Sequence, residues 1–419
     1  MKALIPFCFL AACPFVVADS STEQGWPRWR GPSDSGSSVL GKYAAEWSAS
    51  NHLQWKLALP GKGCSTPIVY DEQILLTSPL DGDDAVLSVD WNGEIRWQTR
   101  IGAEREGRHR NGSGSNPSPV VDETGIYVYF KSGAVAGLGL DGSLRWKINL
   151  QERYGADSLY WDIGSSPVAT AENVIVPVMH DQEGYVVAIH KQTGAIEWKV
   201  DRTYKTPTEN DHSYTTPLLI DHEGNEAVLI WGAEHLTAHD PSDGSVLWSC
   251  GGFDSGGKAN WVAVASAVIV GDVAVVPYGR GSKLAGIKMG GNGDVTQSHR
   301  IWEKDDIGSF VPTPAANQGT VYVLRDRGEV VAVDPKSGEV RWKANFPKHR
   351  SSYYASPVIA DSKLYATRED GTILVADISA EFKLLAQNDL GERMIASPVP
   401  VGDRLLLRGE KHLFCVSSN

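Results

Sequence analysis

The residues best suited to bind a ligand are arginines, histidines and aromatic residues that recur in short polar segments of the chain. A guanidinium group can hold a carboxylate or sulfate through paired hydrogen bonds, and a tryptophan or tyrosine ring can stack on a sugar or peptide group. The candidate ligand-binding residues are His109, Arg110, Trp161, His212, Tyr214, Trp261, Arg280, Arg325, His349, Tyr353, Arg368 and Arg393. They predict a site for a small anionic or carbohydrate ligand, or for a protein partner. The alternative is that they are solvated loop side chains paired with nearby Asp and Glu.

Motifs for catalysis or for a metal ion are absent from the sequence. No HExxH, EF-hand or GxSxG pattern occurs, and the 11 histidines are scattered. The acidic stretch Asp81–Asp84 is typical of a surface turn. Beyond the N-terminus, the three cysteines Cys64, Cys250 and Cys415 do not indicate a disulfide framework, although one long-range pair stays open. We therefore predict no metal site, and the catalytic residues remain unknown.

Composition excludes several classes of protein. The 419 residues are 42% hydrophobic and 21% charged, which is typical of a packed globular chain. The formal net charge of −12 argues against binding of nucleic acid, since duplex binders show a basic surface. Beyond the N-terminus, no apolar run reaches the roughly 18 residues that a transmembrane helix needs.

The N-terminus has the pattern of a secretory signal. Met1-Lys2 precedes the apolar run Ala3–Val17, and the residues that end at Ala18 resemble the small-residue cleavage site of a signal peptide. In the alternative interpretation, the stretch ending at Cys13 is a lipobox, and Cys13 carries a lipid anchor. Either interpretation predicts export, to the periplasm or the outside of the cell.

The candidate residues must be positioned by a repeated element, which begins at a Ser/Thr-Pro dipeptide followed by aliphatic residues. The dipeptides are Thr66-Pro67, Ser118-Pro119, Ser166-Pro167, Thr216-Pro217, Thr313-Pro314, Ser356-Pro357 and Ser397-Pro398. Successive prolines lie 41 to 52 residues apart, except for one interval of 97. That interval holds a proline-free member, Ala265–Val270, so the chain has eight repeats.

A second marker, Gly-x-x-x-Trp, follows later in each repeat. It occupies Gly93–Trp97, Gly142–Trp146, Gly194–Trp198, Gly244–Trp248 and Gly338–Trp342. The fifth repeat is looser and ends at Trp302, and the seventh has Phe382–Leu385 at this place. Runs rich in β-branched and aromatic residues lie between the markers, so each repeat indicates four short strands joined by glycine turns.

Four short strands in about 40–50 residues are typical of a β-propeller blade. We predict an all-β, eight-bladed β-propeller with four antiparallel strands per blade, in which each tryptophan packs against the neighbouring blade near its glycine turn. The last repeat lacks an outer strand, and 53–57 precedes the first repeat, so we expect this N-terminal strand to close the last blade. The predicted organisation is a signal (1–18), an N-terminal segment (19–52) and one monomeric propeller (53–419). A seven-bladed ring would require the fifth repeat to be absent.

Two classes of loop in such a fold open on one face around the central funnel. They are the connections from an outer strand to the next inner strand, and those between second and third strands. The candidate residues all fall in these loops, so we expect them to surround the funnel.

The repeats resemble those of the quinoprotein-like, or PQQ-type, propellers. Their blade motif, Ala-x-Asp-x-x-Thr-Gly-x-x-x-Trp, is similar to Ala332–Trp342, to Ala188–Trp198 with His190 at the Asp position, and to Ala238–Trp248 with Asp243 at the Thr position. The segment Trp26–Pro32 resembles the opening of secreted PQQ-like repeat proteins common in planctomycete-type bacteria. This resemblance covers nearly all of the mature chain.

The resemblance implies two functions. One is a PQQ-dependent dehydrogenase, with the quinone and calcium in the funnel, and the other is a BamB-like, non-enzymatic factor for assembling outer-membrane proteins. The dehydrogenases generally carry a disulfide between adjacent cysteines and have longer loops, whereas this chain has no Cys-Cys pair. We therefore predict an exported, non-enzymatic binding or scaffold protein without a cofactor, and keep both family functions as alternatives.

Overall fold

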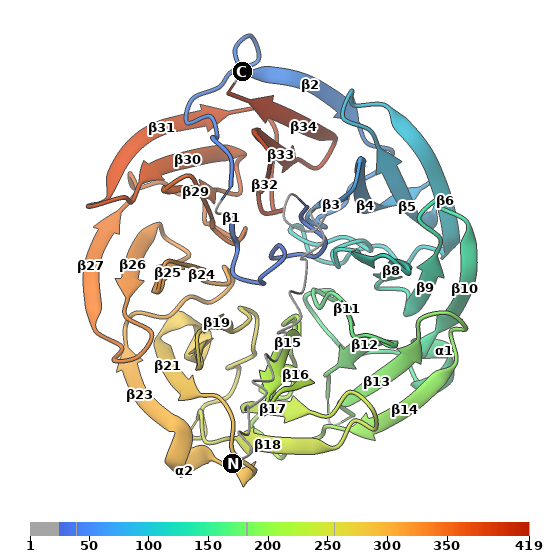
Figure 1. The fold of residues 1–419 in the computed structure, drawn as a ribbon, viewed down its shortest axis with the longest axis vertical. Coiled ribbons are helices and arrows are strands. Elements are labelled where there is room, and N and C mark those ends of the chain that lie inside the picture. Colours follow the sequence, from blue (N-terminus) through green and yellow to red (C-terminus); the bar gives the residue numbers. More distant parts are fainter. Residues whose placement is uncertain (1–24, 39, 182, 255, 419) are drawn as a thin grey trace, which may run out of the picture.

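The computed structural model describes residues 25–38, 40–181, 183–254 and 256–418. The predicted signal (1–18), including Cys13, lies outside the described residues. Eight separate β-sheets surround a central axis, as Figure 1 shows. The predicted eight-bladed propeller is confirmed.

Each blade runs from an inner strand beside the axis to an outer strand at the rim. Blade 1 holds β3 (Ile68–Tyr70), β4 (Gln73–Leu80), β5 (Asp83–Val89) and β6 (Ile95–Ala103). Blade 2 holds β7 (Val120–Asp122), β8 (Gly125–Tyr129), β9 (Ala134–Leu138) and β10 (Leu144–Asn149), after which comes the short helix α1 (Leu150–Tyr154). Blade 3 holds β11 (Val168–Ala169), β12 (Asn173–Val178), β13 (Tyr185–His190) and β14 (Ile196–Asp201). Blade 4 holds β15 (Leu218–His222), β16 (Asn225–Gly232), β17 (His235–His239) and β18 (Val246–Cys250).

The second half of the ring repeats this plan. Blade 5 holds β19 (Val268–Val270), β20 (Val273–Tyr278), β21 (Lys283–Lys288) and β23 (Arg300–Asp305), with the 3₁₀ turn η1 (Gly279–Gly281) between β20 and β21. Blade 6 holds β24 (Ala315–Asn317), β25 (Thr320–Leu324), β26 (Glu329–Val333) and β27 (Val340–Asn345). Blade 7 holds β28 (Val358–Ala360), β29 (Lys363–Thr367), β30 (Thr372–Asp377) and β31 (Lys383–Asp389). Blade 8 holds β32 (Val399–Val401), β33 (Arg404–Arg408) and β34 (His412–Ser417).

The ring closes through a strand from the other end of the chain. Strand β2 (Leu53–Ala58) pairs antiparallel with β34, and Trp55 lies opposite Cys415 in this register. The N-terminal strand therefore supplies the outer strand of blade 8, as predicted from the sequence.

Two blades carry a fifth strand that the repeat pattern does not predict. The short strand β1 (Ser37–Ser38) runs parallel to β28 on the inner side of blade 7. An insertion between β21 and β23 forms two short elements, β22 (Gly293–Asp294) and the helix α2 (Thr296–His299). Strand β22 runs parallel to β18 of blade 4. This insertion explains why the fifth repeat has a looser sequence.

The Gly-x-x-x-Trp marker joins neighbouring blades. The Trp146 ring of blade 2 lies so close to Gly194 of blade 3 that a Cβ there would be 2.7 Å from the ring, and the indole N–H donates to the Lys191 carbonyl at 2.7 Å. The same pair recurs as Trp302 with Gly338. Because a side chain at the glycine would displace the ring, the marker requires both residues, and the predicted structural role of the tryptophans is confirmed.

Within the described residues, no helix is both long and apolar enough to cross a lipid bilayer. The cysteines Cys64, Cys250 and Cys415 are all free thiols. The long-range disulfide that the sequence left open is not formed.

Candidate functional site

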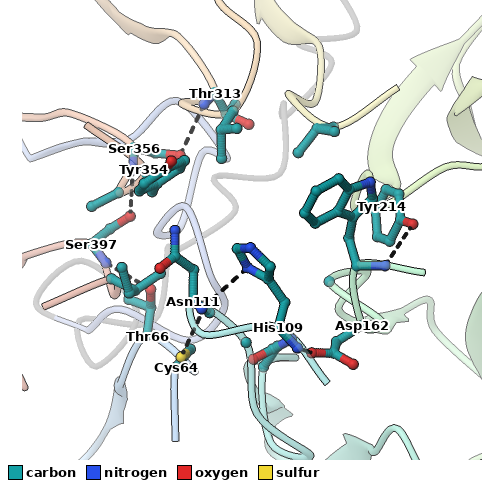
Figure 2. A pocket seen from close by; sticks show the side chains of 18 of the residues that line it. Cys64, Thr66, His109, Asn111, Asp162, Tyr214, Thr313, Tyr354, Ser356 and Ser397 are labelled. Atoms are coloured by element: carbon teal, nitrogen blue, oxygen red, sulfur yellow. Dashed lines mark hydrogen bonds between the residues drawn. The ribbon is translucent and has the colours of Figure 1, made fainter. Parts of the chain in front are cut away.

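A cavity with a volume of about 430 Å³ lies on the axis. Its walls come from the connections between outer strands and the next inner strands, together with Arg280 and Asp326 from two connections between second and third strands. Both predicted classes of loop therefore meet at one face, which we call the loop face. Figure 2 shows the side chains that converge on this pocket.

An N-terminal strap, residues 26–38, crosses the centre of the ring (Figure 1). Trp26 exchanges two backbone hydrogen bonds of 2.8 Å with Val69 of blade 1. On the far side of the axis, the Ser35 carbonyl accepts from Ala316 of blade 6. Trp29 of the strap also lines the pocket.

Inside the strap, the buried Arg30 binds two blades. Its guanidinium donates to the Pro314 carbonyl at 3.1 Å and to the Pro357 carbonyl at 2.9 Å. Burial lowers the Arg30 pKa to about 9, although Asp34 partly opposes this shift. Arg30 thus fixes the strap to blades 6 and 7.

A ring of hydroxyl groups surrounds the axis at the inner part of the pocket. Its eight members are Thr66, Ser118, Ser166, Thr216, Ser266, Thr313, Ser356 and Ser397. In seven places the backbone amide of one member donates to the hydroxyl of the member in the next blade, at 2.8 to 3.2 Å. Between Thr66 and Ser118 of the described chain this bond is not formed, and the Ser115 carbonyl accepts from Cys64 and Ser65 instead. This hydroxyl ring explains why the repeats begin with Ser or Thr.

A buried ion pair shapes the wall formed by blade 2. The Asp162 carboxylate and the Lys131 ammonium are in contact, and both side chains are almost fully buried. The same carboxylate accepts from the backbone amides of Arg108 and His109 at 3.0 and 3.1 Å. Asp162 therefore positions the loop that carries His109 and Arg110.

His109 and Asn111 project into the pocket from this loop (Figure 2). The backbone amide of Asn111 donates to His109 Nδ1 at 3.2 Å, so the neutral ring carries its proton on Nε2. Burial, together with the nearby Arg110, lowers the His109 pKa, which favours this neutral form. The Asn111 side-chain Nδ2 is buried and donates to no atom of the described residues. Both residues thus offer hydrogen-bond donors to a ligand.

Cationic and aromatic groups surround the mouth. Arg110 is mostly exposed and approaches Glu369 at 3.4 Å. The Arg280 guanidinium lies 4.6 Å from the centre of the Phe310 ring. Trp161, which is 40% exposed, stands edge-on to the His109 ring at 4.8 Å. The mouth therefore combines two accessible guanidinium groups with flat apolar surfaces.

The structure brings only some of the twelve predicted residues together. His109, Arg110, Trp161, Tyr214 and Arg280 line the pocket. Five others form pairs with carboxylates beside it, as the alternative interpretation predicts: His212 with Asp181, Arg325 with Glu329, His349 and Arg368 with Asp370, and Arg393 with Glu369.

The two remaining aromatic residues lie outside the pocket lining. The Tyr353 ring is buried against Phe346, and its neighbour Tyr354 lines the pocket instead. Trp261 is half-buried, with the Lys258 ammonium 5.0 Å from its ring centre.

The predicted ligand-binding residues did not include Trp29, Asn111, Asp162 or Tyr354, although the last three lie in loops that were expected to surround the funnel. The Ser or Thr at the start of each repeat was a usable signal for the hydroxyl ring. Equivalent positions of the eight repeats lie side by side around the axis, so a polar residue that recurs there can bond to the equivalent residue of the next blade. No comparable signal marks Asn111, which occurs in one loop only.

The lining does not fit a calcium-held quinone. Calcium takes about six to eight oxygen ligands. Two carboxylates of the described chain line the pocket, Asp162 and Asp326. Asp162 already binds Lys131 and two backbone amides. Asp326 already accepts hydrogen bonds from two backbone amides. Cys64 lines the pocket without the adjacent cysteine that the resemblance implies for the dehydrogenases.

One group of residues outside the pocket has ligand atoms close enough for a metal ion. Atoms of Asp181, Asp211 and His212 lie within 4.8 Å of one another. A hydrogen bond of 2.8 Å between His212 Nε2 and Asp181 accounts for the closest approach. The group therefore gives no independent reason to assign a metal.

Eight interlocked blades around an axial pocket define a β-propeller of the PQQ-like repeat class. The model of the family described as "Outer membrane protein assembly factor BamB" matches residues 36–177, 159–309 and 294–409. The chain belongs to this family.

Individual relatives are distant. The chain is 24% identical to the outer membrane protein assembly factor BamB of Escherichia coli over 370 residues, which cover 84% of this chain and 86% of the relative. It is also 24% identical to BamB of Moranella endobia over 278 residues, which span 61% of this chain and 64% of that relative's length.

Solved structures share the fold. BamB from Moraxella catarrhalis superimposes with a TM-score of 0.62 at 15% identity, covering 87% of this chain and 99% of that structure. Quinohemoprotein alcohol dehydrogenase from Comamonas testosteroni gives 0.70 at 13% identity, covering 96% and 82%. BamB and an alcohol dehydrogenase thus match similarly well, so the fold alone does not assign the function.

Proposed function

We propose that this chain is an exported, non-enzymatic scaffold that takes part in assembling outer-membrane proteins and contacts a polypeptide partner through its loop face. The family match over most of the chain supports this role. The location follows from the N-terminal signal pattern, with Cys13 as the lipid attachment point if the lipobox is used. The mass of the mature N-terminal peptide distinguishes that anchor from cleavage after Ala18.

The observation that carries the proposal is a pair of exposed aromatic side chains on the loop face. Tyr160 and Trp161 are 60% and 40% exposed, and their rings meet edge-on at 4.7 Å. Exposed aromatic residues beside an arginine are typical of the residues that contribute most to binding between proteins. Here Arg110 lines the same pocket as Trp161. Other exposed large apolar residues, such as Ile95 and Leu144, lie on outer strands.

The test is genetic complementation in the source bacterium. Deleting the gene should lower the amount of folded outer-membrane β-barrel protein, and the wild-type chain should restore it. A Tyr160→Ala/Trp161→Ala variant should fail to do so, whereas Leu144→Ala should succeed, because Leu144 has a similar exposed fraction but lies on the rim. Unchanged outer-membrane protein levels after deletion would refute the proposed role.

The non-enzymatic part of the proposal has its own test. Purified protein mixed with PQQ and calcium should not reduce a redox dye in the presence of alcohols. Dye reduction above that of the free quinone would favour the dehydrogenase alternative.

A further inference from the structure

We propose that the axial pocket binds a saccharide that carries a carboxylate, with a uronic acid as the simplest member of this class. This site shares Trp161 and Arg110 with the surface proposed to contact a polypeptide partner, but it does not depend on the assembly role. Its volume of about 430 Å³ falls in the range of about 300–1,000 Å³ that small-molecule sites occupy.

The first argument is the direction of the hydrogen-bonding groups. The Asn111 Nδ2 is a buried donor without a partner among the described residues, and its Oδ1 already accepts from Arg393. The neutral His109 ring carries a second donor, Nε2–H, since its Nδ1 accepts from the backbone amide of Asn111. A buried donor without an acceptor is energetically unfavourable. A ligand rich in oxygen would supply the acceptors that the chain itself does not.

The second argument is the shape of the apolar surfaces. The rings of Trp161, Tyr354, Phe310 and Trp29 line one cavity. A pyranose ring has faces of C–H groups and an edge of hydroxyl groups. It can therefore stack on these rings while its hydroxyls meet His109 and Asn111. A purely apolar ligand would leave those donors unbonded, and a small ion would leave the aromatic surfaces exposed to water.

The third argument is the balance of charge. The Asp162 carboxylate is neutralised by the buried Lys131. Burial raises the pKa of Asp326, which disfavours its negative charge. At the mouth, Arg110 pairs with Glu369, which also pairs with Arg393, and the Arg280 guanidinium donates to the neutral carbonyl of Asn260. The pocket therefore carries excess positive charge, which a carboxylate on the sugar would neutralise through charge-assisted hydrogen bonds.

The backbone at Arg280 supports this assignment. Arg280 has φ of 53°, in the left-handed region that favours glycine, and both neighbours are glycines. Residues other than glycine rarely adopt this conformation, so the backbone at Arg280 is strained. Strain of this kind collects at functional sites.

The experiment compares sugars that differ only in the carboxylate. Galacturonate and glucuronate are titrated into the purified mature chain alongside galactose and glucose, with binding followed by tryptophan fluorescence and calorimetry. We expect saturable binding of at least one uronate, about tenfold or more tighter than that of its neutral counterpart, which corresponds to about 1.4 kcal/mol. Acetate serves as the control for simple anion adsorption.

Variants assign the binding to the pocket. Arg110→Gln and Arg280→Gln should each weaken the uronate by about tenfold without changing the neutral sugar. Trp161→Ala should weaken both sugars, and Arg96→Gln, on the outer strand of blade 1, should change neither. The proposal is overturned if neither uronate binds saturably, if acetate binds as well as the uronate, or if the two arginine variants bind like the wild type. None of these results bears on the outer-membrane protein levels that test the assembly role.

Discussion

The amide of Ser397 donates a hydrogen bond of 3.2 Å to the hydroxyl of Thr66, although 331 positions separate the two residues. They are the last and the first members of the hydroxyl ring, so this bond closes the inner circle of the propeller. At the rim, β2 pairs with β34 to close the outer circle. The two ends of the chain are therefore joined at two radii.

The hydroxyl ring should contribute to stability through its acceptors. In Ser356→Ala, the buried amide of Thr313 loses the hydroxyl that accepts from it at 3.0 Å. We expect the free energy of unfolding to fall by about 1–3 kcal/mol, as for other buried amides left unbonded. Urea denaturation monitored by tryptophan fluorescence measures the change.

Two control variants isolate the effect of the acceptor. Ser356→Thr keeps a hydroxyl that other ring members already use, so it should cost much less. Ser118→Ala should also cost less, because within the described chain the Ser118 hydroxyl does not accept from the ring amide of Thr66. An equal loss in Ser118→Ala and Ser356→Ala would contradict the role given to the ring.

The contact between Trp146 and Gly194 predicts a second difference in stability. Both Gly194 and Gly224 have positive φ, of 71° and 84°, but only a Cβ at Gly194 would meet a ring, at 2.7 Å. Gly224→Ala should cost about 1–2 kcal/mol for the left-handed backbone alone. Gly194→Ala should cost a further 1–3 kcal/mol, roughly the cost of overpacking. Thermal unfolding of the pair measures this; equal values would show that the Trp–Gly contact adjusts freely.

These contacts explain why the fold could be predicted from the sequence. The glycine of each marker packs against the tryptophan of the neighbouring blade, so glycine and tryptophan recur at the same positions of successive repeats. The closing strand was also predictable. The last repeat lacks the outer strand with its tryptophan, and a strand with Trp55 lies before the first repeat. By contrast, β22 arises from an insertion that occurs once, so no periodic signal could reveal that it pairs with β18.

The site was less predictable, since it depends on contacts between distant loops. Tyr353 and Tyr354 are neighbours in one loop, and the sequence does not say which ring is buried against Phe346. Arg393 meets Glu369 from another loop of the same face, so its charge is paired in a way that spacing along the chain does not show. Trp29 lines the pocket only because the strap crosses the axis.

A buried histidine makes stability depend on pH. His239 Nδ1 donates to the Gly244 carbonyl at 2.9 Å, and its Nε2 contacts the Thr237 hydroxyl at 2.9 Å. Burial lowers its pKa to about 4, against about 6.5 in the unfolded chain. Between these values the unfolded state binds more protons, so acidification favours unfolding.

We therefore expect the free energy of unfolding to fall by about 3 kcal/mol between pH 7 and pH 4 because of this group. His239→Gln does not titrate and should lose correspondingly less over the same range, whatever its stability at pH 7. Urea denaturation at several pH values measures the two slopes. Parallel slopes would show that other groups determine the acid sensitivity.

The pair of Asp162 and Lys131 should hold the pocket wall in place. Asp162→Asn leaves the buried Lys131 charge uncompensated, which typically costs about 3–5 kcal/mol. The loop should also loosen, so trypsin should cut faster at Arg108 and Arg110, which is read by mass spectrometry of a digestion time course. The exposed pair of Lys199 and Asp201 provides the control, because Asp201→Asn should cost less than about 1 kcal/mol. Unchanged cleavage in Asp162→Asn would mean that other contacts position the loop.

The strained backbone at Arg280 allows charge and conformation to be separated. Arg280→Gly and Arg280→Ala both lose the guanidinium and its contact with the Phe310 ring. Only the glycine variant relaxes the left-handed backbone, so it should unfold with a free energy about 1 kcal/mol larger than that of the alanine variant. Both should lose affinity for the uronate equally, because affinity depends on the charge. The two variants could instead differ in affinity for the uronate and have the same stability. That result would mean that Arg280 acts by shaping the loop between β20 and β21, and that the ligand does not contact its positive charge.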